Sequence, residues 1–121
     1  MNTALWIVQV ILAAVFLMAG IMKLSQPADK LVKAGQAWAG RVSSSTLKLI
    51  GLMEFLGAIG LILPKLLEII PILTPVAASA LALVMVLAMI NHARAGEKKE
   101  IVSNIILLVL TAFVAYGRFF L

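Results

Sequence analysis

Charged residues divide the chain into four long apolar stretches. The first ends at Lys23, the second lies between Lys48 and Lys65 with Glu54 inside it, and the third and fourth follow. A helix needs about 20 residues, within a range of about 17–25, to cross ~30 Å of hydrocarbon. No stretch alternates apolar and polar residues with the period of two that a membrane β-strand shows. The pattern therefore predicts four transmembrane helices, at residues 3–24, 46–64, 70–92 and 100–118.

The composition of the chain is that of an integral membrane protein. Apolar residues make up 64% of the 121 residues, 12% are charged, and the mean hydropathy is +1.15. A soluble domain needs about 25% charged residues to cover its surface. The chain has room for a single domain, residues 1–121. Because three of the spans are joined by short links, we expect an all-α polytopic membrane protein, an antiparallel bundle of four transmembrane helices.

The basic residues predict an orientation in the membrane. A net charge of +5 is compatible with nucleic-acid binding, but these residues sit between apolar stretches, so the predicted partner is the lipid bilayer and not nucleic acid. Segments 23–48 and 91–100 hold eight lysines and arginines, and the opposite side holds only Lys65 and Arg118. The positive-inside rule places the eight in the cytoplasm. We therefore expect a multi-pass protein of the bacterial inner membrane with both termini on the non-cytoplasmic side.

The segment between the first two spans shows two faces. Pro27 suits an early helical position. Leu31, Gly35, Trp38 and Val42 fall near one stripe, while lysines and Arg41 fall on another. This pattern predicts a short amphipathic helix on the inner leaflet, with Trp38 as its anchor and the basic residues toward anionic headgroups. A solvated loop with some helix remains the alternative.

Each predicted span carries its small and polar side chains on one stripe. The residues that define the stripes are Gln9, Gly20 and Lys23; Gly51, Glu54 and Ala58; Thr74, Ala78 and His92; and Asn104, Thr111 and Arg118. Lipid cannot satisfy polar groups, so these stripes should meet inside the bundle, where small residues allow helices to approach closely.

Four of these polar residues are predicted to lie near the cytoplasmic ends of their helices. They are Lys23, Glu54, His92 and Asn104. Glu54 lies about 9 Å into the membrane from Lys48. An ionised acid there is costly, so we expect Glu54 to be protonated or paired with Lys23 or His92. We predict an interior polar cluster that opens toward the cytoplasm and forms a ligand-binding site or a polar core.

Each member of this cluster also has a purely structural interpretation. Glu54 can belong to a buried pair that fixes helix register. Lys23 can extend to the headgroups from a helix end, and His92 can lie at the membrane interface. Asn104 is expected to form hydrogen bonds between helices. The sequence leaves both sets of interpretations open.

Four short motifs follow one another along the chain. They are residues 19–24, Gly51–Glu54 with Gly57 and Gly60, His92 with Gly96-Glu97, and Asn104 through Tyr116-Gly117-Arg118. With these motifs the whole chain resembles the DoxX-like family of small bacterial membrane proteins. The resemblance implies a four-helix protein in which Lys23, Glu54 and Asn104 match recurrent polar positions. The family takes its name from a subunit of a thiosulfate:quinone oxidoreductase, so the resemblance also implies an association with membrane redox complexes.

The residue inventory excludes several kinds of chemistry within one chain. There is no cysteine, so thiol chemistry, Fe–S clusters and cysteine zinc sites are excluded. His92 is the only histidine, which excludes a haem held by two histidines of the same chain. His92 and Glu54 alone are too few to hold a metal ion. Gly57-Ala58-Ile59-Gly60 lies within a predicted span, where it indicates helix packing and not a nucleotide loop.

Three classes of function remain open on the sequence. In the first, the chain is a redox-associated subunit in which Lys23, Glu54 and His92 line a pocket for a quinone or another apolar ligand. In the second, it is a small proton-coupled transporter. The absence of an acid in the first span and the strong charge bias disfavour a likeness to the small four-helix multidrug pumps. In the third, it is a non-catalytic scaffold or assembly factor. Other membrane subunits or a second copy are the expected protein partners.

Overall fold

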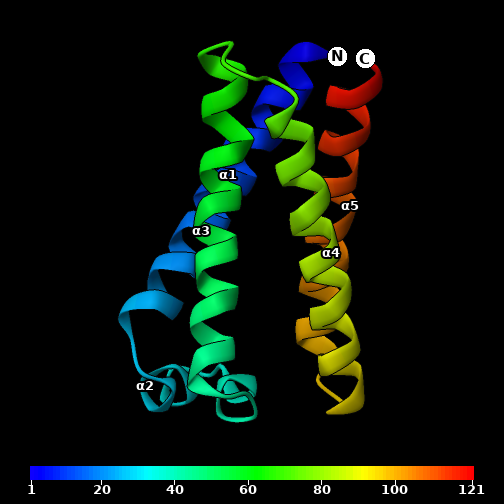
Figure 1. The fold of residues 1–121 in the computed structure, drawn as a ribbon. Coiled ribbons are helices and arrows are strands. Elements are labelled where there is room, and N and C mark those ends of the chain that lie inside the picture. The colour runs from blue at the N-terminus through cyan, green and yellow to red at the C-terminus, as the bar shows by residue number, and fades with distance from the viewer.

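The computed structural model describes residues 1–121 and is entirely helical (Figure 1). Its elements are α1 (Asn2–Ser25), α2 (Ala28–Lys33), the 3₁₀-helix η1 (Ala37–Gly40), α3 (Ser44–Leu66), α4 (Leu73–Arg94) and α5 (Lys98–Phe120). The helices α1, α3, α4 and α5 are long and apolar enough to cross a membrane. The prediction of an all-α protein with four spans and a short helix between the first two is therefore confirmed.

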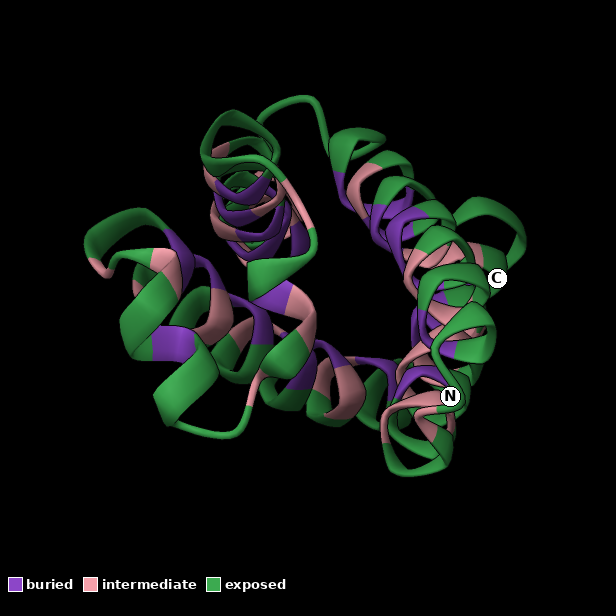
Figure 2. Cartoon of the chain, turned by 90° about the horizontal axis from the view of Figure 1, so that it is seen from below, coloured by how far each residue is buried: buried purple, intermediate pink, exposed green.

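The four long helices form a closed ring. Helix α1 packs on α3, α3 on α4, α4 on α5, and α5 returns to α1. Both termini lie at the same end of the bundle, together with the turn between α3 and α4 (Figure 1). We call this the terminal end, and we call the opposite end, which holds α2, η1 and the α4–α5 link, the basic end. Figure 2 shows that the buried sides of the helices face one another across the interior.

The helix bounds agree with the predicted spans to within a few residues, with the largest shift at the start of α4. The predicted span began at residue 70, whereas α4 begins at Leu73. Glu68 and Ile70 have positive φ angles of 53° and 47°, so the backbone reverses direction there and cannot be helical. The turn between α3 and α4 therefore takes up residues that the apolar pattern assigned to the membrane.

The segment between α1 and α3 is not one continuous helix. Helix α2 has six residues, and the chain breaks at Gly35, whose φ of 99° is in the left-handed region. Leu31, Ala39 and Leu47 form a small buried cluster that fixes α2 and η1 against the start of α3, with Trp38 packed beside it. The predicted stripe through Gly35 is therefore broken into two short pieces, and these pieces cover the basic end of the bundle.

Two glycines bring α1 and α3 into close contact. A Cβ atom on Gly20 would lie 2.7 Å from the carbonyl oxygen of Gly51 and 2.7 Å from the amide nitrogen of Phe55. A Cβ atom on Gly51 would lie 2.7 Å from the Cβ of Lys23. Real Cβ atoms do not approach backbone this closely, so only glycine fits at the crossing. This crossing sets the position of Lys23 against α3.

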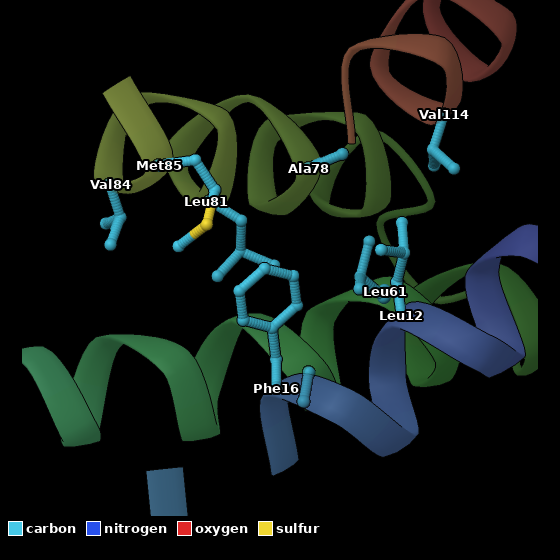
Figure 3. Packing of buried hydrophobic residues seen from close by; sticks show 9 residues of the cluster. Leu12, Phe16, Leu61, Ala78, Leu81, Val84, Met85 and Val114 are labelled. Carbon is cyan, nitrogen blue, oxygen red and sulfur yellow. The ribbon is translucent and has the colours of Figure 1, made fainter. Parts of the chain in front are cut away.

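Buried apolar side chains from all four spanning helices fill the middle of the bundle. The cluster consists of Leu12, Phe16, Ala58, Leu61, Ala78, Leu81, Val84, Met85 and Val114. Figure 3 shows the ring of Phe16 pointing toward Leu81 and Met85 of α4. Along α1, Leu12 and Phe16 lie between Gln9 and Lys23. The core therefore separates the polar groups of the terminal end from those of the basic end.

Polar side chains of α1 and α4 bond to backbone carbonyls near a proline in α3. Pro64 has no N–H, so the carbonyl of Gly60 in α3 loses its helical partner. The hydroxyl of Thr74 in α4 donates to that carbonyl at 2.9 Å. Gln9 of α1 donates to the carbonyl of Leu61 at 2.6 Å. These bonds satisfy backbone groups that lipid could not satisfy, and they join three helices.

Arg118 of α5 completes the polar contacts at the terminal end. Its Nε donates to Gln9 Oε1 at 2.6 Å, and its second nitrogen donates to Asn2 Oδ1 at 2.8 Å. The guanidinium also lies 5.2 Å from the ring centre of Trp6. Arg118 therefore joins α5 to α1.

Candidate functional site

An ion pair between α1 and α3 lies inside the bundle toward the basic end. Lys23 Nζ and Glu54 Oε1 are 2.7 Å apart, and the two side chains are 10% and 6% exposed. Removing two charges from water is costly, and their attraction offsets that cost only when the geometry is good. The pairing expected for Glu54 is thus made with Lys23 and not with His92.

The pair is close but incompletely satisfied. Lys23 Nζ, 2.7 Å away, is the only polar partner of Glu54 Oε1. An ammonium group has three donors and a carboxylate has about four acceptor sites. Both partners therefore retain hydrogen-bonding capacity that the protein does not use.

Lys48 holds the end of α1 in place below the pair. Its Nζ donates to the carbonyls of Lys23, Leu24 and Gln26 at 2.8, 3.1 and 3.0 Å. The last carbonyls of a helix lack partners within the helix, and a cation there also interacts favourably with the helix dipole. Lys48 therefore caps the C-terminal end of α1. This cap fixes the backbone that carries Lys23.

Trp38 of η1 covers the pair from the basic end. Its ring centre lies 5.4 Å from Lys23 Nζ, within the range of a cation–π contact. The same ring meets the ring of His92 in α4 edge-on, with centres 6.3 Å apart. The role of Trp38 as a membrane anchor stays a prediction, and the structure adds that the half-buried indole packs on Lys23 and His92. Trp38 is the residue that connects the Lys23–Glu54 pair to His92.

Arg41 and Glu97 join η1 to the link between α4 and α5. Arg41 donates to the two carboxylate oxygens of Glu97 at 2.6 and 3.2 Å and to Asn91 Oδ1 at 3.0 Å. His92 Nδ1 lies 2.8 Å from Glu97 Oε1. The hydrogen bond from Arg41, and then that from His92, lower the pKa of Glu97 from 4.5 to about 2. Glu97 is therefore ionised, and it accepts a hydrogen bond from the N–H of His92 Nδ1.

Asn104 lies apart from these contacts. It is buried in α5, with 8% of its surface exposed, and its Nδ2 has no hydrogen-bond partner. The predicted role of Asn104 in hydrogen bonding between helices is therefore wrong. Of the four residues predicted for the site, the structure joins Lys23 to Glu54 directly and His92 to both through Trp38, and it leaves Asn104 without a partner.

Trp38, Arg41 and Glu97 were not among the predicted site residues. The sequence pattern placed Trp38 and Arg41 at the membrane surface, and Glu97 appeared only within the Gly96-Glu97 motif. The useful signal was the position of Glu97 five residues after His92 across a glycine turn, where Gly96 has a φ of 73°. Such a turn brings the carboxylate back to the imidazole.

The remaining features of the bundle narrow the kind of ligand that the site suits. No group of three or more metal-binding side chains exists, so the residues do not fit a metal ion. Two apolar grooves of about 340 and 210 Å³ lie on the outside of the bundle. The smaller follows the seam between α1 and α3 and includes Ala58, one turn from Glu54. The site combines a buried ion pair with a nearby apolar seam.

The comparison with known proteins identifies the family of the chain. A family model described as the DoxX-like family matches residues 7–114. Because the match covers most of the chain, the protein belongs to the DoxX-like family. No curated protein and no solved structure gave a significant match.

Proposed function

We propose that this member of the DoxX-like family is a ligand-binding membrane subunit. It binds the polar head of a quinone, or of a similar molecule with an apolar tail, at the Lys23–Glu54 pair and serves a membrane redox complex. The observation that carries the proposal is this pair itself, which is buried and close, and whose two groups have no other hydrogen-bond partner. A pair that acted only as a link between helices would gain from complete hydrogen bonding. The unused donors of Lys23 and the unused acceptors of Glu54 are available to a bound ligand.

The residues fit the head of a quinone. The carbonyl oxygens of a quinone accept hydrogen bonds, and a bound quinone supplies two-electron, two-proton redox chemistry. The Lys23 ammonium can donate to such an oxygen, and Glu54 can exchange a proton with it. The seam between α1 and α3 supports the placement of an apolar tail next to the pair. Trp38 limits the access of water from the basic end.

The packing of the core favours binding over transport. A proton-coupled transporter needs a polar route between the two sides of the membrane. Here Leu12, Phe16, Leu61 and the side chains packed on them separate the Lys23–Glu54 pair from the polar contacts of Gln9. The pair thus lies on the basic-end side of the apolar core, without a polar route to the terminal end.

The proposal includes a location and partners. The basic end faces the cytoplasm of a bacterial cell, both termini face away from it, and the bundle lies in the inner membrane, as the distribution of lysine and arginine supports. Other membrane subunits or a second copy of the chain contact its exposed apolar surface. A scaffold without ligand is the alternative, and it predicts stoichiometric partners but no bound small molecule.

The test is extraction and mass spectrometry of gently purified protein. Wild type should retain a quinone or another apolar ligand, and Glu54→Gln should lose it, because the substitution removes the carboxylate and leaves Lys23 as an unpaired buried charge. Glu68→Gln, at an exposed acid of the terminal end, is the matched control and should retain the ligand. Wild type that carries only ordinary phospholipid would contradict the proposal and favour the scaffold.

A further inference from the structure

The unpartnered amide of Asn104 is a second polar group for which the fold gives no use. Asn104 as a residue is 8% exposed, and its Nδ2 is buried without a hydrogen-bond partner. Buried polar groups are nearly always hydrogen-bonded, and each exception calls for a reason. Thr111, the other buried polar residue of α5, has such a partner, since its hydroxyl donates to the carbonyl of Leu107 in its own helix at 2.8 Å.

Asn104 lies at about the same depth in the bundle as the glycine crossing of α1 and α3. Gly117 of α5 packs directly against Leu5 of α1, which sets the register of these two helices. From that contact Asn104 lies thirteen residues toward the basic end and Gly20 lies fifteen. At 1.5 Å per residue these are displacements of about 20 and 22 Å.

Glu54 shares this depth from the other side of the bundle. Gly20 meets Gly51 and Phe55 of α3, and Glu54 lies between these two positions. Helices α3 and α5 are not neighbours in the ring, since each packs on α1 and on α4 (Figure 2). Glu54 and Asn104 are both buried within the bundle. They therefore lie on opposite corners of the interior at one level.

We infer that Asn104 is a ligand-binding residue that donates, through Nδ2, to an acceptor atom of the ligand head on the side opposite Lys23. The inference rests on the proposed function and defines the head more closely. Lys23 is a donor on the α1–α3 side, and Asn104 Nδ2 is a donor on the α5 side. A ligand that satisfies both carries hydrogen-bond acceptors on two opposite edges of a compact head, as a 1,4-dicarbonyl ring does.

The test compares two probes on reconstituted protein. The first is a decyl-substituted 1,4-benzoquinone, with two opposed carbonyls, and the second is an aromatic ketone with the same tail and one carbonyl. Binding is measured as a Kd from the quenching of tryptophan fluorescence. Asn104→Leu should weaken binding of the two-carbonyl probe about tenfold, the effect of one hydrogen bond, and leave the one-carbonyl probe unchanged. Asn104→Ala provides the same test with less risk of overpacking.

Thr111→Val is the matched control. It also replaces a buried polar side chain on the same face of α5, but its hydroxyl bonds only to its own helix, so both affinities should stay as in wild type. The melting temperature without ligand gives a second readout. Removing an unpartnered amide should leave the melting temperature unchanged or raise it. Removing a structural hydrogen bond would lower the melting temperature.

The outcomes separate the inference from the proposed function. If wild type binds both probes and Asn104→Leu changes neither Kd, Asn104 is not a binding residue and the Lys23–Glu54 site stands alone. A fall in melting temperature for both Asn104→Leu and Asn104→Ala, with unchanged Kd values, would make the amide structural and overturn the inference. If wild type binds neither probe, both the proposed function and the inference are wrong.

Discussion

Arg41 and Glu97 are bound to each other across the basic end, with two hydrogen bonds of 2.6 and 3.2 Å. Arg41 follows η1 in the connection between α1 and α3, and Glu97 lies in the link between α4 and α5. The contact therefore joins the first pair of spanning helices to the second. It also holds Trp38 over Lys23, because η1 carries both Trp38 and the backbone that leads into Arg41.

The Arg41–Glu97 contact makes the closure of the basic end sensitive to acid. The folded-state pKa of Glu97 is lowered from 4.5 to about 2, so its stabilising effect is fully present above 4.5 and is lost as the pH falls from about 4.5 to about 2. In a Trp6→Phe background, Trp38 fluorescence should report opening in this range. Glu97→Gln should remove the pH-dependent change, and Glu100→Gln should retain it. Identical titrations for all three proteins would contradict this prediction.

The buried pair predicts an asymmetry between single and double substitutions. Lys23→Met leaves an unpaired carboxylate in the bundle and should lower stability by about 3–5 kcal/mol. Lys23→Met with Glu54→Leu removes both charges and should restore most of that stability. Unfolding in detergent by denaturant gives the measurement. Additive effects of Lys23→Met and Glu54→Leu would show that the two groups do not interact.

The glycine crossing predicts a strong steric effect at one position of α1. Gly20→Val forces side-chain atoms into the backbone of α3 and should lower stability by about 1–3 kcal/mol or more. Ala4→Val adds similar bulk at an exposed position of the same helix and is the control. The melting temperature should fall for the first variant only. Equal melting temperatures for the two variants would mean that α1 and α3 can move apart at the crossing without a loss of stability.

The proposed orientation predicts the behaviour of a reporter at the C-terminus. A fused protein that is fluorescent only in the cytoplasm should stay dark, because the positive-inside rule places Leu121 on the other side. The same reporter inserted at Gly35, in the connection between α1 and α3, should be bright and is the positive control. A bright C-terminal fusion would reverse the orientation.

The sequence predicted the spans well because bilayer thickness and apolar runs determine them directly. It placed Lys23 and Glu54 together because both lie on the small-residue stripes of adjacent helices. The positive φ angles at Glu68 and Ile70 were not predictable, since neither residue type favours them. The packing of Trp38 was also missed, because an amphipathic pattern does not distinguish a side chain that packs on lipid from one that packs on protein.

The partners of the long polar side chains were the least predictable part of the site. Lys48 and Arg118 lie at span ends, where extension to the headgroups and contact with a neighbouring helix both satisfy a cation. The choice depends on which carbonyls and amides lie within reach, and that depends on helix register. Lys48 donates to a carbonyl at the end of α1, and Arg118 donates to the side chain of Gln9. Asn104 finds no partner, which no sequence pattern signals.

The Lys23–Glu54 pair also determines how the site responds to voltage. As an ion pair it has no net charge, so the transmembrane potential does no net work when it moves as a unit. Protonation of Glu54 would leave a single positive charge on Lys23. A charge that crosses the whole membrane gains or loses about 2.3 kcal/mol per 100 mV, and one at this depth only a fraction of that. Motion of the ionised pair is thus insensitive to the membrane potential, and it becomes sensitive only when Glu54 takes up a proton.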